Sequence, residues 1–320
     1  MLIYTLRRIN LLLCTLLLLS FFAYWLEYEL GVDKYTSLWS GYLEYLRHLF
    51  AGDLGISSLS GRPALEMIAI HFPATFELCL SALIIAFVVG VTLGTLAALN
   101  QGKTLDVVIS SFSVLGSSMP VYWLALLLIL IFSMTLGLLP SSGQLNLLYE
   151  IEPVTGLTLI DTLLSQDGHQ LSAFYNALQH LCLPAAALAL LPTTEITRLV
   201  RNSMIDVLKQ NYIKAAFSRG WSPWRVITRH ALRNALPPIF PMLSMQFGAV
   251  VTSAIIIEMI FEWPGLGRWL IACIMGRDYV AIQAGLLVIS SVLAVLNIST
   301  ELLTNLLYPV KRKELYGQQG

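Results

Sequence analysis

The chain has 320 residues, of which 57% are hydrophobic and only 12% are charged. A soluble domain of this length usually carries about twice that share of charged residues, so the composition argues against an ordinary soluble protein. The formal net charge is zero, so no overall field indicates a nucleic-acid partner.

Apolar segments recur along the chain at the length that a bilayer requires. A membrane-spanning helix needs about 20 mostly apolar residues, and six segments approach or exceed that length. In chain order they are Ile9–Leu26, Ala74–Leu99, Val107–Leu136, Leu178–Val200, Ile239–Phe261 and Ala281–Leu307. The third contains Pro120 after a stretch rich in Ser and Gly, so we expect a kinked helix there. We therefore predict an all-α integral membrane protein with six transmembrane helices.

The first apolar segment follows Arg7 and Arg8, as the core of a secretory signal peptide would. However, its apolar stretch is longer than a typical signal core, and no small-residue cleavage site follows it. We interpret it as a retained anchor.

The distribution of Lys and Arg predicts the orientation, because these residues mark the cytoplasmic side of membrane proteins. Of the nineteen, fourteen precede the first span, lie in the second and fourth connections, or follow the last span. The third connection, about Gly137–Ala177, carries no Lys or Arg and four carboxylates, which are Glu150, Glu152, Asp161 and Asp167. We therefore predict that both termini are cytoplasmic.

The fourth connection, Arg201–Leu236, is the most informative segment. The residues from Asp206 to Gly220 are predicted to form one helix, and helical spacing places Tyr212, Ala215, Ala216, Arg219 and Gly220 on one face. Small residues on that face would let a partner approach closely. Ser222 and Pro223 then supply an N-cap and a first-turn proline for a second helix, which would end before Pro237 and carry Arg225, Arg229 and Arg233 as a basic stripe. On spacing alone, a surface element that faces anionic lipid fits as well.

The same segment resembles a known family. Three runs in this segment resemble the EAA loop of binding-protein-dependent ABC permeases, and specifically that of the dipeptide/oligopeptide branch. They are Tyr212-Ile213-Lys214-Ala215-Ala216, Arg219-Gly220 and Arg229-His230-Ala231-Leu232-Arg233-Asn234-Ala235-Leu236-Pro237. Phe217 and Ser218 depart from the branch, which commonly has Arg and Ala at these positions.

Further matches in the same order extend the resemblance over the whole chain. They are Leu6-Arg7-Arg8, Gly52-Asp53-Leu54-Gly55-Ile56-Ser57, Pro73-Ala74-Thr75-Phe76-Glu77-Leu78, Ser117, Pro120, Trp123-Leu124, Leu136-Gly137-Leu138-Leu139-Pro140, Glu258, Trp263-Pro264-Gly265-Leu266-Gly267 and Arg277-Asp278-Tyr279. Within the branch, part of the third connection resembles the corresponding segment in the permeases of antimicrobial-peptide uptake systems. The matching residues are Leu147-Leu148-Tyr149-Glu150, Pro153, Thr155-Gly156 and Ile160-Asp161.

This resemblance implies a type I ABC importer permease with the MetI-like fold, located in the bacterial inner membrane. It implies transport of peptides, including cationic antimicrobial peptides, by a complex with a second permease, two ATPase subunits and a periplasmic binding protein. The EAA loop would act as a coupling helix seated in a cleft of the ATPase, with Tyr212, Ala215, Ala216, Arg219, Gly220, Arg229 and Arg233 as its contact residues. This chain would bind no cofactor, since ATP and Mg belong to the ATPases. Its divisions would be a first helix with a periplasmic segment (residues 1–72), a five-helix core (73–310) and a cytoplasmic tail (311–320).

The remaining motifs provide little evidence for a function. Gly102-Lys103-Thr104 resembles part of a phosphate-binding loop, but Ala97 occupies the position of the first glycine and no strand precedes it. Gly90 and Gly94 form a GxxxG pair, for which we expect tight packing inside the subunit rather than dimerisation. The scattered histidines and the four cysteines lack metal-ligand spacing, and we expect the cysteines to act as small hydrophobic residues.

Polar residues at membrane depth are costly, so each requires an explanation. Glu77 and Glu301 lie near span ends, where we expect a structural role with the carboxylate extended toward the interface. Glu258 also lies near the end of its span, and it could either line the substrate pathway or form a structural pair.

Two other classes of membrane protein remain as alternatives. An autonomous secondary transporter or channel usually has inverted repeats or ionisable residues at the bilayer midplane, whereas the mid-span positions here are apolar. A membrane-embedded hydrolase would need paired catalytic residues within the spans, and none is evident in the sequence.

Overall fold

The computed structural model describes residues 2–29, 37–165 and 168–307 of the chain. Over these residues the regular structure is helical, apart from one isolated bridge between Ile56 and Pro63. The longer helices are α1 (Leu2–Glu29), α2 (Leu38–Phe50), α3 (Ala64–Leu99), α4 (Thr104–Ser118), α7 (Gln170–Leu208), α11 (Ile239–Ile260), α12 (Leu266–Met275) and α13 (Tyr279–Leu307). The shorter ones are α5 (Val121–Leu128), the π-helix η1 (Ile129–Thr135), α6 (Thr158–Leu164), α8 (Asn211–Ser218), α9 (Pro223–Val226), the π-helix η2 (Ile227–Ala231) and α10 (Leu232–Ala235).

Each predicted span lies in helical structure, which for the third is divided among α4, α5 and η1, but the count of six transmembrane helices is not confirmed. By length and apolar composition, α3, α7, α11 and α13 can each cross a membrane. The bent pair α4–α5 brings the count to five if it is one span, and the apolar part of α1, Ile9–Trp25, is shorter than the other spans.

Two helices extend well beyond their predicted spans. Helix α3 begins ten residues earlier than predicted and continues through Pro73, so the predicted division after residue 72 falls inside a helix. Helix α7 starts eight residues earlier than predicted and continues past Val200 to Leu208. The added start of α3 is mostly apolar but precedes Pro73, through which the helix continues. The added ends of α7 carry polar residues such as Asn176, Arg201 and Asp206, which hydropathy alone does not assign to a span.

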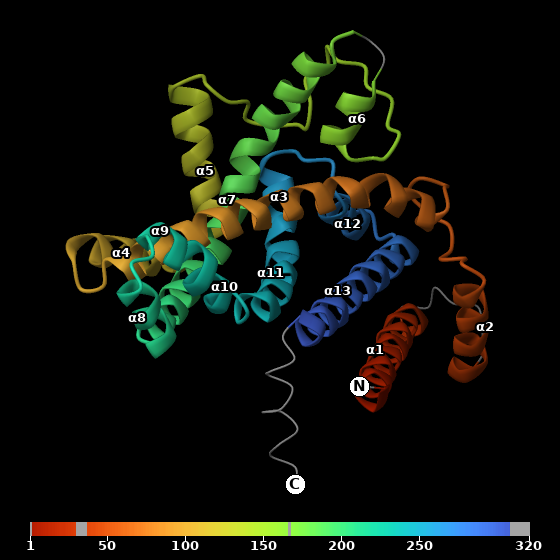
Figure 1. Cartoon of the computed structure of the whole chain (residues 1–320). Helices are drawn as coiled ribbons and strands as arrows, with labels where there is room; N and C mark the ends of the chain where they lie inside the picture. Colours follow the sequence, from red (N-terminus) through yellow and green to blue (C-terminus); the bar gives the residue numbers. More distant parts are fainter. Residues whose placement is uncertain (1, 30–36, 166–167, 308–320) are drawn as a thin grey trace.

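The centre of the fold is the packing of α3 against α7 (Figure 1). A Cβ atom added to Gly90 would lie 2.8 Å from the Ile196 side chain, and one added to Gly94 would lie 2.6 Å from the carbonyl oxygen of Thr197. These two glycines therefore let the helix backbones approach closely within one subunit, as predicted from the GxxxG pair.

The third predicted span is not a single kinked helix. Helices α4 and α5 meet at an angle of 105° around Met119 and Pro120, and α5 continues into η1 (Figure 1). Proline stops α4 because it cannot donate a backbone hydrogen bond and because it disfavours the α conformation for the residue before it. Gly116 lets α4 pack closely on α7, since a Cβ atom there would lie 2.8 Å from Thr194 Cγ2.

Helices α1 and α2 pack at the edge of the fold, where α1 contacts α13 (Figure 1). Aromatic side chains join the C-terminal half of α1 to α2: Phe21 contacts Tyr42 edge-on at 5.1 Å, and Tyr24 stacks on Tyr45 at 5.6 Å between ring centroids. Such rings are typical of the boundary between hydrocarbon and headgroups.

The third connection is anchored by two carboxylates. Glu77 of α3 accepts hydrogen bonds from the backbone N–H groups of Thr158 (3.1 Å) and Leu159 (2.8 Å), at the start of α6. Asp161 accepts hydrogen bonds from the Thr155 N–H and hydroxyl and from the Gly156 N–H. Glu77 is only 6% exposed. Its role is structural, as expected, but it caps a helix instead of extending toward the interface.

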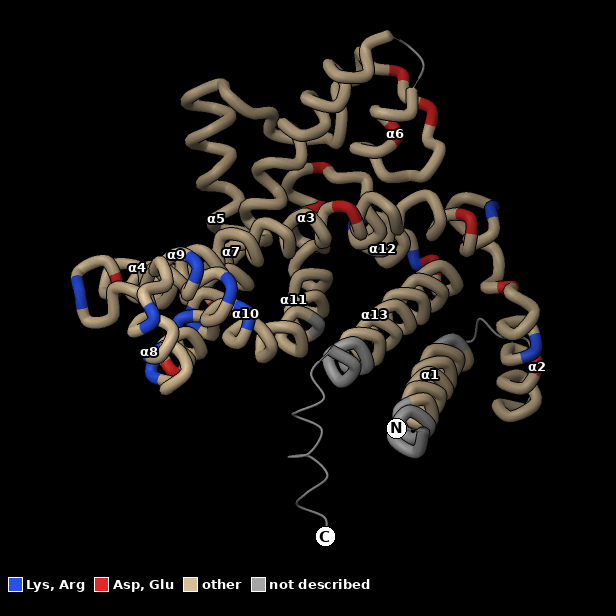
Figure 2. Tube along the Cα trace, viewed as in Figure 1, with Lys and Arg blue, Asp and Glu red and all other residues tan. Residues whose placement is uncertain are grey.

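Charges are segregated along the molecule. Figure 2 shows Lys and Arg gathered around α8, α9 and α10, whereas Asp and Glu mark the region of α6.

Among the described residues, no group of His, Cys, Asp and Glu has the geometry of a metal site. Cys79 and Cys273 are buried, whereas Cys14 and Cys182 are exposed, and none of the four forms a disulfide. The tail, residues 311–320, and the side chain of Glu301 lie outside the described residues.

Candidate functional site

The helix predicted over Asp206–Gly220 is two helices in the structure. Helix α7 ends at Leu208, the backbone turns at Lys209, and Gln210 adopts an extended conformation (φ −67°, ψ 145°) before α8. This break separates α7 from the amphipathic helix α8. Because the two helices are not continuous, α8 can run in a different direction from α7. The prediction of one continuous helix was therefore wrong.

Gly220 ends α8 in a Schellman motif. Its N–H donates to the carbonyl oxygen of Phe217 (2.9 Å), and the Trp221 N–H donates to that of Ala216 (3.4 Å). The φ angle of Gly220 is +78°, in the left-handed region that favours glycine. No atom lies within 4 Å of the position that a Cβ would take, so the space beside Gly220 is open in this chain.

The second predicted helix is confirmed, with an altered interior. Ser222 occupies the N-cap with extended dihedrals, although its side chain makes no capping hydrogen bond, and Pro223 occupies the first turn. The helical path then runs through α9, the π-helix η2 and α10 before Leu236. A π-helical segment within a helix frequently marks a functional position.

The buried and exposed faces of α8–α10 differ in chemistry. The inner face consists of apolar residues that join the core, which are Ile213, Ala216, Val226, Ala231 and Ala235. The predicted contact residues on the exposed side are Tyr212, Ala215, Arg219, Gly220, Arg229 and Arg233. Ala216 is 9% exposed and packs inward. Helical spacing groups it with the outer face, but it lies next to Ile213 at the edge of the buried face.

Aromatic side chains add to this exposed side, and the prediction from sequence did not single them out beyond Tyr212. Trp224 is 76% exposed, Tyr212 47% and Phe217 42%. Trp221 contacts the His230 ring at 4.9 Å between centroids, and the Tyr212 hydroxyl accepts a hydrogen bond from Asn234 Nδ2 (3.1 Å). The sequence places four aromatic residues within 13 positions of a basic loop. That pattern could have predicted a protein interface here, because Trp and Tyr are enriched at such interfaces. We call the exposed side of α8–α10, with these aromatic and arginine residues, the loop surface.

A partly buried ion pair connects α4 to α7 about two turns before the end of α7. Arg201 donates to Asp106 through Nε (2.5 Å) and through an Nη atom (2.8 Å), and Asp106 also accepts from the Gly102 N–H (2.9 Å). The Asp106 side chain is 5% exposed. Bidentate Arg–carboxylate pairs fix orientation as well as distance. Ser203 then joins α7 to the end of α10 by donating to the Ala235 carbonyl oxygen (2.9 Å).

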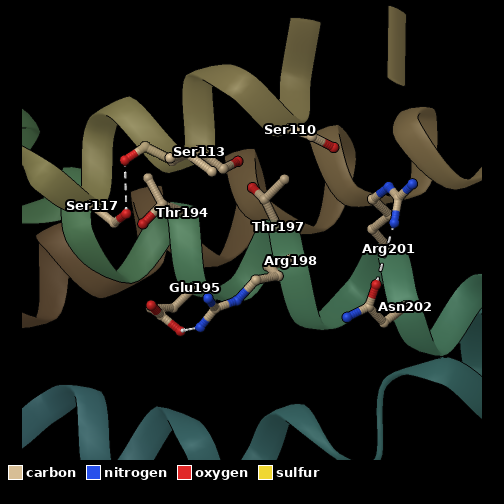
Figure 3. Close-up of a pocket in the computed structure, with 10 residues that line it drawn as sticks. Ser110, Ser113, Ser117, Thr194, Glu195, Thr197, Arg198, Arg201 and Asn202 are labelled. Atoms are coloured by element: carbon tan, nitrogen blue, oxygen red, sulfur yellow. Dashed lines mark hydrogen bonds and ion pairs between the residues drawn. The ribbon is translucent and has the colours of Figure 1, made fainter. Parts of the chain in front are cut away.

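A pocket of about 290 Å³ lies between α4 and α7 beside this ion pair (Figure 3). Its polar lining comprises three serines of α4 and five residues of α7 near Arg201: Ser110, Ser113, Ser117, Thr194, Glu195, Thr197, Arg198 and Asn202. Within the pocket, Arg198 pairs with Glu195 at 2.6 Å. This pocket was not predicted from the sequence.

Glu258 does not border this pocket and is enclosed in the protein. Its side chain is completely buried; Oε1 accepts from the Thr75 hydroxyl (2.5 Å), and Oε2 accepts from the Arg268 N–H (2.9 Å). Gly265 and Gly267 leave room for the carboxylate, since a Cβ on Gly267 would lie 2.9 Å from Oε2. This geometry supports a structural role rather than a place in the pathway, and it explains why the turn between α11 and α12 requires glycines.

Comparison with known proteins identifies the family. Residues 90–313 match the profile of the binding-protein-dependent transport system inner membrane component. The chain belongs to this family of ABC transporter permeases. Over 99% of both chains, it is 45% identical to a protein of Escherichia coli K12 named "Putrescine export system permease protein SapB" and to one of Salmonella typhimurium named "Peptide transport system permease protein SapB". It is also 41% identical, over 88% of this chain and 82% of the relative, to the di/tripeptide permease DppB of Pseudomonas aeruginosa.

The fold of the permease also has a solved counterpart. A chain from the inward-facing MetNI methionine ABC transporter superposes on it with a TM-score of 0.52, covering 72% of this chain and 92% of that chain at 14% identity. This likeness shows a shared fold. The predicted MetI-like permease architecture and the resemblance to peptide permeases are therefore confirmed, and as a permease subunit the chain is a multi-pass membrane protein.

Proposed function

We propose that this permease subunit moves peptides, including cationic antimicrobial peptides, across the bacterial inner membrane by following the ATP-driven motions of partner subunits. The loop surface is the observation that carries the proposal. It presents arginines and exposed aromatic rings, whereas its inner face is packed into the helical core. A surface that is exposed but rigidly attached is suited to transmitting movement from a docked protein.

In this proposal the loop surface docks into a cleft of an ATPase subunit. Tyr212, Arg219, Arg229 and Arg233 contact the ATPase, and Ala215 and Gly220 allow close approach. Ala216 supports the docking element from inside, since it packs toward the core. ATP and Mg bind to the ATPase subunits, and ATP hydrolysis takes place there, not in this chain.

The complete transporter would contain this permease, a second permease, two ATPase subunits and an external binding protein. The pocket between α4 and α7 is not fully enclosed by this chain, so in this proposal the second permease supplies its remaining side. A ligand-binding protein would deliver the cargo at the opposite end from the loop surface, where α6 and the acidic third connection lie.

The proposed cargo follows from the relatives. The SapB protein of Salmonella typhimurium and the DppB protein of Pseudomonas aeruginosa are named as peptide permeases, whereas the SapB protein of Escherichia coli K12 is named for putrescine export. Cationic peptides and putrescine both carry ammonium groups, so we propose an ammonium-bearing cargo and favour peptides.

The orientation is proposed from charge. The clustering of Lys and Arg at the loop surface (Figure 2) supports a cytoplasmic location for this end, and their distribution along the sequence supports the same location for both termini. A periplasm-active reporter enzyme fused after Leu148 should be active, and the same reporter after Gln210 should be inactive. The reverse pattern would contradict this orientation.

Charge reversal on the loop surface tests the proposed function. The double variant Arg229→Glu/Arg233→Glu should insert and co-purify with the second permease but should lose the ATPase subunits, because two attractive contacts become repulsive. The matched control is Arg47→Glu/Arg62→Glu, which alters two exposed arginines far from the loop. Unchanged recovery of the ATPases with the first variant would contradict docking at this surface.

A further inference from the structure

The pocket between α4 and α7 is lined by hydroxyl groups in a regular arrangement (Figure 3). Ser110, Ser113 and Ser117 recur at spacings of three and four residues and therefore share one face of α4. Thr194 and Thr197 face them from α7. The opposite side of α4 is apolar and exposed, as at Phe112 and Leu115. Helix α4 thus has a hydroxyl face toward the pocket and an apolar face suited to lipid or a partner helix.

Each of these hydroxyl groups already uses its proton within its own helix. Ser113 donates to the Ile109 carbonyl oxygen (3.0 Å) and Ser117 to that of Val114 (2.9 Å). On α7, Thr194 donates to the Leu191 carbonyl oxygen (2.8 Å) and Thr197 to that of Thr193 (2.7 Å), and Ser110 donates to Asp106 (3.4 Å). A hydroxyl has one donor and two acceptor lone pairs. The serine oxygens of α4 can therefore accept hydrogen bonds from a ligand, whereas Thr194 and Thr197 are only 3% and 2% exposed and present little accessible surface.

The charged groups of the pocket do not oppose a cationic ligand. Arg201 is held by both oxygens of Asp106, and Arg198 is paired with Glu195. Each positive charge is thus matched by a carboxylate in direct contact. The Glu195 side chain is 27% exposed, so its carboxylate can accept a further donor.

Helix α4 directs its hydroxyl groups toward the pocket and its apolar residues away from it, which is the arrangement expected where water or cargo occupies the pocket, because polar groups in hydrocarbon are costly. We propose that the hydroxyl face of α4 and α7 lines the cytoplasmic half of the transport pathway and binds the ammonium and peptide N–H donors of the cargo. The inference rests on the proposed function and specifies the site at which the cargo interacts with this chain.

Water access is tested first, by cysteine labelling in the assembled transporter. In a background where the exposed Cys14 and Cys182 are replaced by serine, Ser113→Cys should react with a charged, membrane-impermeant maleimide in inside-out vesicles. Thr92→Cys is the matched control: Thr92 is exposed on α3, and its hydroxyl also donates to a carbonyl four residues earlier, but it lies outside the pocket. The control should not react, since its neighbours Val88 and Val89 are exposed and apolar.

Failure of Ser113→Cys to react would overturn the proposal, because it would mean that lipid or a helix of the second permease covers the hydroxyl face. If the residue does react, trilysine should slow the labelling, and the acetylated, uncharged form of trilysine should slow it less. Putrescine serves as a second probe, and protection by putrescine alone would assign the site to a diamine and overturn the peptide part of the proposal. Labelling that none of the probes slows would overturn the binding role.

Transport gives the second readout. In proteoliposomes with the whole complex, Ser113→Ala/Ser117→Ala should raise the KM for trilysine about tenfold, the effect of losing one hydrogen bond to a charged group. Thr92→Val should leave KM unchanged. Co-purification of the ATPases should remain at the wild-type level in both, which separates this inference from docking at the loop surface. An unchanged KM in the double variant would overturn the assignment.

Discussion

Substitutions at Gly220 can separate helix capping from contact with the ATPase. Gly220 lies at φ +78° in the Schellman motif that ends α8, with open space beside it. A side chain at this position therefore meets no obstacle within the chain, but it forces a left-handed conformation that most residues resist. The cost of that conformation is on the order of 1 kcal/mol, which a membrane protein of this size should tolerate.

Three variants differ in strain and in bulk. Gly220→Ala introduces the strain with little bulk, and Gly220→Asn introduces bulk with less strain, because asparagine adopts positive φ more readily. Gly220→Leu introduces both strain and bulk, with a side chain larger than that of asparagine. If Gly220 only caps α8, the alanine and leucine variants should both lower stability by about 1 kcal/mol and all three should transport normally.

If Gly220 lies against the ATPase, bulk decides the outcome. The asparagine and leucine variants should insert normally but lose ATP-driven transport, whereas the alanine variant should retain most of it. The assay is transport by the reconstituted complex, with thermal unfolding in detergent to measure strain and co-purification to measure ATPase binding. Wild-type transport by both the asparagine and leucine variants would refute the contact at this residue. Lost transport with retained ATPase binding would mean that the contact transmits motion and does not contribute affinity.

Two further predictions concern buried carboxylates. Glu258→Ala should lower stability by at least about 3 kcal/mol, because the hydroxyl of Thr75 and the N–H of Arg268 lose their buried acceptor; a well-folded variant with altered cargo selectivity would instead restore the pathway role. Burial acts to raise the pKa of Asp278, but hydrogen bonds from Ser57 and from the N–H groups of Leu59 and Ala281 outweigh it and hold that pKa below its ordinary value. Its stabilising contribution is therefore complete above pH 3.8 and is lost as the pH falls through the lowered pKa. Thermal unfolding measured from pH 6 downward should show this loss, and Asp278→Asn should remove it.

Local signals in the sequence were sufficient for several elements. The Ser222-Pro223 start of the second loop helix and the close packing at Gly90 and Gly94 both agree with the structure. Each depends on the conformational properties of one or two residues, which are similar in any context. The apolar segments also predicted where helices occur, because apolar composition over about 20 residues indicates a span regardless of topology.

Other features depend on packing between distant segments. Pro120 predicts an interruption, but the 105° angle between α4 and α5 also depends on how Gly116 seats α4 on α7. The inward position of Ala216 likewise depends on which side of α8 meets the core. The burial of Glu258 requires Thr75, which is 183 residues away. No local pattern encodes these contacts.

The pocket and the loop surface are linked through one helix. Helix α7 carries Thr194 and Thr197 of the hydroxyl face, then Arg201, and then leads directly into α8. The two hydrogen bonds from Arg201 to Asp106 tie the first turn of α4 to α7, and Ser203 ties α7 to the end of α10. A displacement of α8–α10 that leaves these contacts intact must therefore move both walls of the pocket with it. Because α4 and α7 move together, such a displacement would change the access to the pocket while preserving its shape, and the opposing side of the pathway would have to come from the second permease.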